Sequence, residues 1–183
     1  MQLASVDTAS ILKLNATPTH NLRIDSQNDD QPARSAKDFR FAIVASRWNN
    51  SIVSRLIDGA LEALREAAVP DQAIELYRVP GSFEIALCAL KAAASRKFDA
   101  VICLGVIIRG ETPHFDFIAG EAARGISEAS LKTGVPVLFG VITAENVDQA
   151  NARAGVRQDN KGYEAALAAV EVVNLYRDAF GSN

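Results

Sequence analysis

From Phe39 onward the sequence alternates between short apolar runs, rich in β-branched residues, and longer stretches with apolar residues at helical spacing. Short apolar runs are typical of buried strands, and longer periodic stretches are typical of amphipathic helices. The expected strands are residues 39–46, 74–80, 98–108 and 135–143, and the expected helices are residues 51–69, 82–95, 115–134 and 160–180. Strict alternation of strand and helix predicts an α/β fold with a four-stranded parallel sheet between two helix layers, that is, a three-layer αβα sandwich.

The segment before Phe39 lacks this pattern. Its last part, RIDSQNDDQPARSAKD, is polar and contains a proline but no apolar periodicity. We therefore expect a polar, poorly ordered arm over residues 1–38 and one domain over residues 39–183. Asp7, Asp25, Asp29 and Asp30 argue against a transit peptide, and the lack of a continuous apolar stretch argues against a secretory signal.

Composition narrows the classes of partner. Hydrophobic residues make up 49% of the 183, which is enough for a substantial core at this length. The net charge is −3, so neither a nucleic acid nor a membrane surface is an expected partner. A phosphate ligand would therefore have to be held by a local site. Apolar helical faces in excess of what four strands can cover suggest subunit contacts, so we expect a homo-oligomer.

Both cysteines, Cys88 and Cys103, lie among apolar neighbours. A disulfide is one interpretation, but two buried free thiols in a reducing compartment, the cytoplasm, is the interpretation we favour. We expect no metal site, because neither cysteine has a second Cys or His at zinc-ligand spacing. A protein without a metal site can still bind a ligand at the edge of its sheet.

In an open α/β sheet, ligands bind outside the carboxyl ends of the strands. This rule selects SRWNN, VPGSFE, VIIRGETPH and FGVIT, which follow or end the four expected strands. Trp48 in the first of these segments is either a packing residue or a flat surface on which a planar heterocycle stacks. Its polar neighbours favour stacking. Ser82 and Glu84 in the second segment either cap the following helix or accept hydrogen bonds from ligand hydroxyls.

The third segment concentrates the chemistry. His114 is expected in the first turn of a helix, where an imidazole can donate and accept protons, although a surface or capping role is equally open. Glu111 and Thr112 precede it, and Thr112 can offer a hydroxyl and a backbone N–H to an anion. No G-x-S-x-G, G-x-G-x-x-G or Walker pattern occurs. Arg153 and Lys161 are further candidate anion ligands, with a solvated surface as the alternative.

These segments together resemble the 6,7-dimethyl-8-ribityllumazine synthase family, which acts in riboflavin biosynthesis. The resemblance covers residues 39 to about 178 and rests on VPGSFE, GVIIRGETPHFDF, FGVITAENVDQA, RAG and NKGYEAA in order. It implies a flavodoxin-like subunit, assembly into pentamers, an active site between neighbouring subunits, and no cofactor or metal. The implied reaction condenses 5-amino-6-(D-ribitylamino)uracil with 3,4-dihydroxy-2-butanone 4-phosphate.

The resemblance also assigns roles. The residues it places at the pyrimidine substrate and its ribityl chain are Trp48, Ser82, Phe83, Glu84, Val106, Ile107, Ile108 and Phe139. Phe139, at the end of the fourth strand, would reach across from the neighbouring subunit. Glu111, Thr112 and Arg153 would meet the butanone phosphate, with His114 as proton donor and acceptor. Most family members have Phe where this chain has Trp48, so riboflavin is a further expected ligand.

Two other functions stay open at this point. The archaeal type of riboflavin synthase is a distant relative on the same scaffold, and a flavin-binding shell protein without catalysis is a second alternative. The assembly is also open: the short segment RAGVRQDNK resembles the loop of members that form sixty-subunit shells, whereas the long arm before Phe39 argues for smaller particles.

Overall fold

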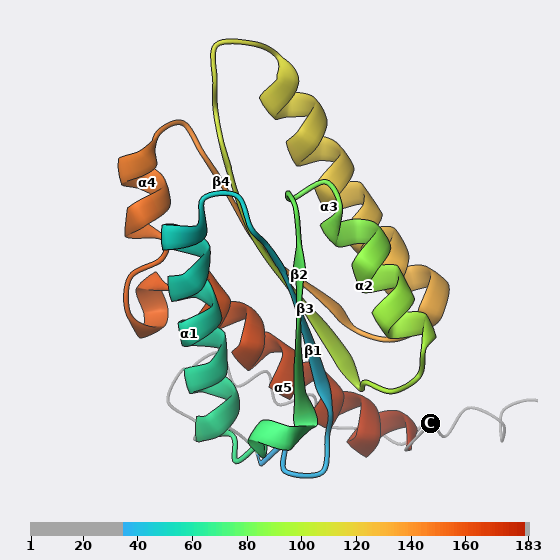
Figure 1. Ribbon diagram of the computed structural model, residues 1–183. Coiled ribbons are helices and arrows are strands. Elements are labelled where there is room, and N and C mark those ends of the chain that lie inside the picture. Colours follow the sequence, from blue (N-terminus) through green and yellow to red (C-terminus); the bar gives the residue numbers. More distant parts are fainter. Residues whose placement is uncertain (1–34, 182–183) are drawn as a thin grey trace, which may run out of the picture. The chain divides into compact units, whose positions relative to one another are not determined.

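The computed structural model describes residues 35–181. Its strands and helices alternate along the chain (Figure 1). The strands are β1 (Phe41–Ser46), β2 (Ile74–Val79), β3 (Ala100–Ile108) and β4 (Val137–Ala144), and the helices are α1 (Asn50–Glu66), α2 (Ile85–Ala94), α3 (His114–Thr133), α4 (Val147–Ala152) and α5 (Lys161–Phe180). The four strands form one parallel sheet in the order β2-β1-β3-β4, which confirms the expected α/β fold.

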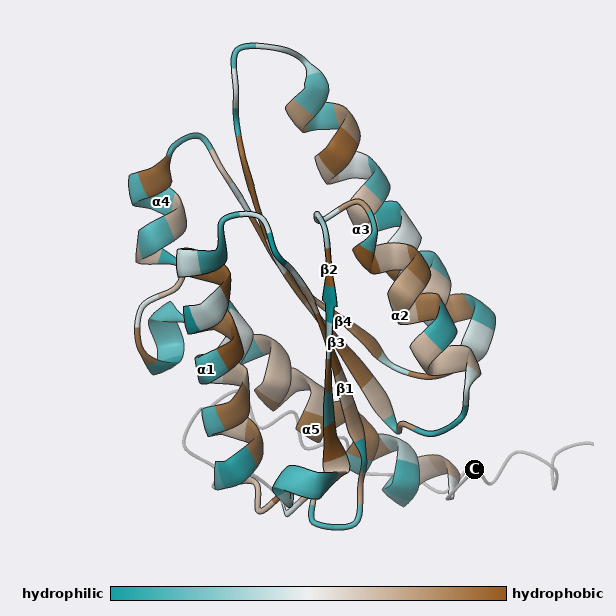
Figure 2. Ribbon diagram, in the orientation of Figure 1, coloured by the Kyte–Doolittle hydropathy of each residue, from teal (hydrophilic) through white to brown (hydrophobic). Residues whose placement is uncertain are grey.

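Helices cover both faces of this sheet. Phe41, Ile43 and Ala45 of β1 belong to a core with residues of α1 and α5, whereas Ala42 and Val44 belong to a second core with residues of α2 and α3. Successive strand residues point to opposite faces, so a strand buried on both sides must be apolar throughout. The first eight residues of β3 are all buried, as expected for a central strand. Figure 2 shows the apolar sheet between helices whose outer surfaces are mixed or polar.

A buried asparagine fixes the junction between α1 and α5. Oδ1 of Asn160 accepts from the backbone N–H groups of Gly162 and Tyr163, at 2.9 and 3.2 Å. Its Nδ2 donates to the carbonyl oxygens of Arg55 and Gly155, at 2.9 and 3.0 Å. The backbone of Gly162 packs directly on α1, because a Cβ at this position would lie 1.9 Å from the carbonyl oxygen of Leu56.

Several expected boundaries need correction. Helix α2 begins at Ile85, three residues later than expected, and β4 extends to Ala144. Helix α4 was not expected; the Asn146 side chain caps it by accepting from the Gln149 N–H at 2.9 Å. Ala36, within the segment assigned to the arm, is fully buried and its N–H donates to the Ala67 carbonyl. The expected disorder of the arm concerns residues 1–34, which lie outside the described residues.

The two thiols are free. Cys103 lies fully buried in β3, as expected, whereas Cys88 in α2 is only half-buried, so the expectation of two buried thiols holds for Cys103 alone. Burial raises the pKa of both thiols above the ordinary value, which suppresses the reactive thiolate form. Within residues 35–181, no helix is long and apolar enough to cross a membrane. The same residues contain no group of three or more His, Cys, Asp or Glu side chains arranged to hold a metal.

Candidate active site

A cavity of about 430 Å³ opens at the carboxyl ends of the strands. Its lining comes from the loops that follow β1, β2 and β3 and from the first turn of α3. Figure 1 shows these loops at the same end of the sheet. The residues that line it are Trp48, Asn49, Pro80, Gly81, Ser82, Phe83, Glu84, Val106, Ile107, Ile108, Gly110, Thr112, His114, Phe115 and Ile118. Nine of the twelve residues to which the family resemblance assigns roles therefore surround one cavity. Parallel strands end at one edge, which is why segments far apart in the chain meet there.

The first loop presents an exposed indole. Trp48 is 69% exposed, so it is not a core residue, and it stands between β1 and α1. Asn49 beside it adopts a left-handed backbone with φ 55°, and its Nδ2 donates to the Val106 carbonyl oxygen at 3.3 Å. The N–H of Trp48 donates to the Pro80 carbonyl oxygen at 3.2 Å. These bonds tie the loop that carries the indole to the loop after β2 and to β3.

The second loop is closed by Glu84. This side chain accepts from the Gly81 N–H at 2.8 Å and occupies the N-cap position of α2. Ser82 is buried and lines the cavity, but it lies three residues before the helix, so the interpretation of Ser82 as an N-cap is wrong. Phe83 is 54% exposed. The chain turns at Pro80 and Gly81, so α2 begins only at Ile85. Ser82, Phe83 and Glu84 precede the first residue of the helix and line the cavity.

The third loop brings the imidazole to the cavity wall. His114 is the first residue of α3, which agrees with its expected place in the first turn although the expected helix began at Phe115, and Pro113 occupies the N-cap position. Thr112 lines the cavity too, whereas Glu111 is exposed and does not. A hydrogen-bonded ion pair with Arg109 holds the pKa of the Asp116 carboxyl below its ordinary value. The ion pair between Arg109 and Asp116 therefore connects the two ends of the loop on its exposed side.

Three of the expected site residues lie outside the cavity. Phe139 is the third residue of β4 and 45% exposed, so the expectation that it stands at the end of the strand is wrong. It pairs in register with Cys103, well before Val106 and the cavity. Arg153 is exposed at the C-cap of α4, and its carbonyl accepts from the Lys161 N–H at 2.9 Å. Together with Glu111, these residues do not meet the cavity within one subunit.

The comparison with known sequences decides the family. Residues 38–177 match the model of the family described as 6,7-dimethyl-8-ribityllumazine synthase. The chain belongs to the 6,7-dimethyl-8-ribityllumazine synthase family. A protein of that name from Chlorobium luteolum is 54% identical over 80% of this chain and 94% of its own length. Another of that name, from Syntrophus aciditrophicus, is 51% identical over 78% of this chain and 92% of its own length.

Family membership agrees with the resemblance drawn from the sequence and does not favour the two alternative functions. Several cavity residues of this family member were nevertheless missed. The sequence indicates Asn49 only as a polar neighbour of Trp48. Its positive φ marks it as a candidate site residue, but a backbone angle is visible in coordinates alone. Ile118 follows His114 by four residues, the spacing of neighbours on one helix face, and could have been found in this way, whereas Phe115 could not.

The arrangement suits a planar, polar ligand. Trp48 provides an aromatic face, the Val106–Ile108 segment provides buried walls, and Ser82 and Thr112 provide hydroxyl groups. Among the described residues that line the cavity, His114 is the one imidazole, the side chain that most often donates and accepts protons in catalysis. Chemistry that proceeds by proton transfers between bound organic groups fits such a site.

Proposed function

We propose that this protein is a transferase that condenses 5-amino-6-(D-ribitylamino)uracil with 3,4-dihydroxy-2-butanone 4-phosphate. The products are 6,7-dimethyl-8-ribityllumazine, phosphate and two molecules of water, and this is the penultimate step of riboflavin biosynthesis. The observation that carries the proposal is the cavity shared by Trp48 and His114 in a chain of this family. An aromatic platform and a proton-transfer group are the two elements that the reaction needs most.

The reaction is a sequence of additions and eliminations. The amine attacks the ketone, and the carbinolamine loses water to give an imine. Phosphate then leaves by elimination, and a second attack closes the ring with loss of another water. His114 serves as the proton donor and acceptor in these steps, and holding two substrates together contributes the remainder of the rate enhancement. No electron is transferred between the substrates and an outside acceptor at any step.

The pyrimidine substrate is proposed to stack on Trp48. Stacking of a base on an aromatic side chain typically contributes about 1–3 kcal/mol. Backbone groups of Val106, Ile107 and Ile108 bind the edge of the ring, and the loop with Ser82, Phe83 and Glu84 holds the ribityl chain. Thr112 meets the butanone phosphate beside His114, and Glu111, which is exposed and outside the cavity of its own chain, is placed at the phosphate by the family resemblance alone. Riboflavin, with a larger ring system and the same ribityl chain, is proposed as a competing ligand.

A neighbouring subunit completes the site in this proposal. Phe139 is aromatic and exposed on β4, and Arg153 is an exposed guanidinium at the end of α4. Neither reaches the cavity of its own chain, so each is available to a cavity of an adjacent copy. Arg153 suits the phosphate group, because a guanidinium binds phosphate oxygens through two parallel hydrogen bonds. Phe139 would close the pyrimidine pocket from the other side.

The proposed unit of assembly is a pentamer in the cytoplasm. The free thiols of Cys88 and Cys103 suit a reducing compartment. The short segment between Arg153 and Lys161 favours further assembly into a sixty-subunit shell. Light scattering or analytical ultracentrifugation tests this step. A particle near five times the 19.6 kDa of one chain would exclude the shell and keep the pentamer.

A direct assay tests the function. The purified protein is mixed with both substrates, and formation of the lumazine is followed by its absorbance and compared with the slow reaction without protein. A rate enhancement that grows with enzyme concentration is the expected result. Riboflavin binding without any enhancement would overturn the proposal and support a non-catalytic flavin-binding protein.

A further inference from the structure

Arg109 is the first residue after β3, and it starts the loop that leads to His114. Its backbone N–H donates to the Ala144 carbonyl oxygen at 2.9 Å, which extends the pairing of β3 with β4 by one residue. The position of its Cα is therefore fixed by the sheet. The side chain is 36% exposed and makes contacts on both sides of the loop.

The guanidinium makes three kinds of contact. Nη1 and Nη2 donate to the two carboxylate oxygens of Asp116, at 3.2 and 3.0 Å, in a bidentate pair. Nε lies 2.9 Å from a carboxylate oxygen of Glu145, the residue after β4. The guanidinium carbon lies 4.1 Å from the centre of the Phe115 ring. One planar group therefore joins the sheet edge to the two residues that directly follow His114.

We propose that Arg109 is a positioning residue for His114, which sets the first turn of α3 against the cavity through Asp116 and Phe115. The proposal rests on the proposed function only for the role of His114 as the proton-transfer group. Arg109 does not line the cavity itself, so it acts through the residues it holds.

The loop has little else to fix it. Within residues 35–181, the backbone of Gly110, Glu111 and Thr112 makes no hydrogen bond to another part of the backbone. A Cβ on Gly110 would meet no atom within 4 Å, so this part of the loop is not packed. Phe115 and Ile118 pack the first turn of α3 against the core, and the Arg109 side chain adds the polar contacts that tie this turn to the sheet edge.

The contact requires the shape of arginine. A guanidinium can form two parallel hydrogen bonds with one carboxylate and at the same time lie over an aromatic ring, whereas an ammonium group cannot. Arg109→Lys keeps the charge and most of the length but removes this geometry. The positively charged group near Asp116 and Glu145 remains, so the variant separates geometry from charge.

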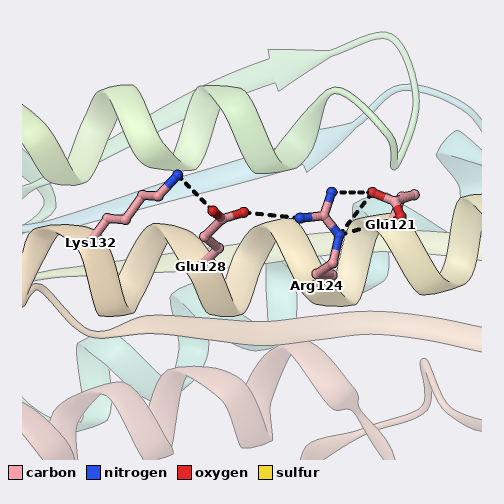
Figure 3. Close-up of polar contacts among 4 residues, drawn as sticks. All are labelled: Glu121, Arg124, Glu128 and Lys132. Atoms are coloured by element: carbon pink, nitrogen blue, oxygen red, sulfur yellow. Dashed lines mark hydrogen bonds and ion pairs between the residues drawn. The ribbon is translucent and has the colours of Figure 1, made fainter.

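A second arginine on α3 offers a matched control. Arg124 forms ion pairs with Glu121 and Glu128, and Glu128 in turn pairs with Lys132. Figure 3 shows these four side chains in a row along the helix. None of the four lines the cavity. Exposed ion pairs of this kind contribute little to stability, so Arg124→Lys should leave both stability and turnover unchanged.

The experiment compares Arg109→Lys, Asp116→Asn and Arg124→Lys with the unmodified enzyme in the lumazine assay. We expect the first two variants to lower kcat by at least about threefold, and by less than the roughly hundredfold typical of lost acid–base catalysis. The KM for the pyrimidine and the unfolding temperature should stay unchanged. Combining Arg109→Lys with His114→Ala should lower kcat no further than His114→Ala alone, because the positioned group is already missing.

Three outcomes would overturn the inference. These are an unchanged kcat in Arg109→Lys, a loss of equal size in Arg124→Lys, and an undiminished effect of Arg109→Lys in the His114→Ala background. The last would mean that Arg109 supports the structure in general. An unmodified enzyme that makes no lumazine would instead contradict the proposed function, so the two failures are distinguishable.

Discussion

Gly81 and Trp48 lie in contact across the two loops that follow β1 and β2. A Cβ on Gly81 would lie 3.3 Å from Cε3 of the indole and 3.1 Å from Oε2 of Glu84. These separations are tighter than ordinary van der Waals contact, so any side chain at Gly81 requires a neighbour to move. The exposed indole is the neighbour with most freedom to move, and its position is linked to the residue at position 81.

The first prediction follows from this contact. Riboflavin should quench the emission of Trp48, the chain's one tryptophan, and Gly81→Ala should weaken riboflavin binding. A displaced indole loses part of the roughly 1–3 kcal/mol typical of stacking, so we expect a loss of affinity of up to about tenfold. Fluorescence titration measures both effects. Gly120→Ala is the control, because a Cβ there meets nothing and Gly120 does not line the cavity. Emission that saturating riboflavin leaves unchanged would place the stacking site elsewhere.

The fold was predictable because its signals are local. Each strand and long helix carries its own apolar pattern, and the left-handed Gly134 ends α3 where the sequence predicted. Boundaries that depend on particular hydrogen bonds were less predictable. The six-residue helix α4 depends on the Asn146 cap, and the late start of α2 depends on the bond between Gly81 and Glu84.

The residues of the candidate site likewise fall into a predictable group and a group that the sequence did not predict. Residues on the loops after β1, β2 and β3 were predictable from the rule that ligands bind at the carboxyl ends of strands. Phe139 was misplaced because its position was taken from the family resemblance, although the expected strand 135–143 already had it in the middle. Arg109 was not singled out as a functional residue, since its contacts with Asp116 and Glu145 join segments seven and thirty-six residues away.

A second prediction concerns His114. His114→Ala should lower kcat by about a hundredfold or more, because proton transfer by a positioned side chain is typically worth at least that much. The slow uncatalysed reaction sets a floor that can reduce the visible loss. Substrate affinity should change little, since the cavity keeps its walls and its platform. Steady-state kinetics with each substrate varied in turn measures both quantities. Unchanged turnover would remove His114 from the mechanism.

Arg153 gives a third prediction. Arg153→Ala should raise the KM for the butanone phosphate far more than the KM for the pyrimidine, because the phosphate group is carried by the former substrate alone. Arg153→Lys should restore part of the loss, since it keeps the charge without the paired hydrogen bonds. The same kinetic assay measures the effect. Equal changes in both constants would indicate a structural role at the end of α4.

A fourth prediction concerns stability. Asn160→Ala would leave the N–H groups of Gly162 and Tyr163 and two carbonyl oxygens without their present partner. Unpaired buried polar groups are costly, so we expect a loss of about 2–4 kcal/mol in the free energy of unfolding. Asn146→Ala is the matched control, because that side chain caps a helix at the exposed surface and its loss should cost about 1 kcal/mol. Denaturant unfolding measures both, and equal losses would contradict the role assigned to Asn160.

The cavity draws its walls from three loops, and a complete strand–helix unit separates each loop from the next. No fragment of the sheet can form the binding surface, so the affinity for a ligand exists in the folded chain alone. A bound ligand therefore shifts the equilibrium between the folded and unfolded chain, by about 2.7 kcal/mol at a hundred times its dissociation constant. The supply of substrate thereby also sets how long each copy of the enzyme resists unfolding and degradation in the cell.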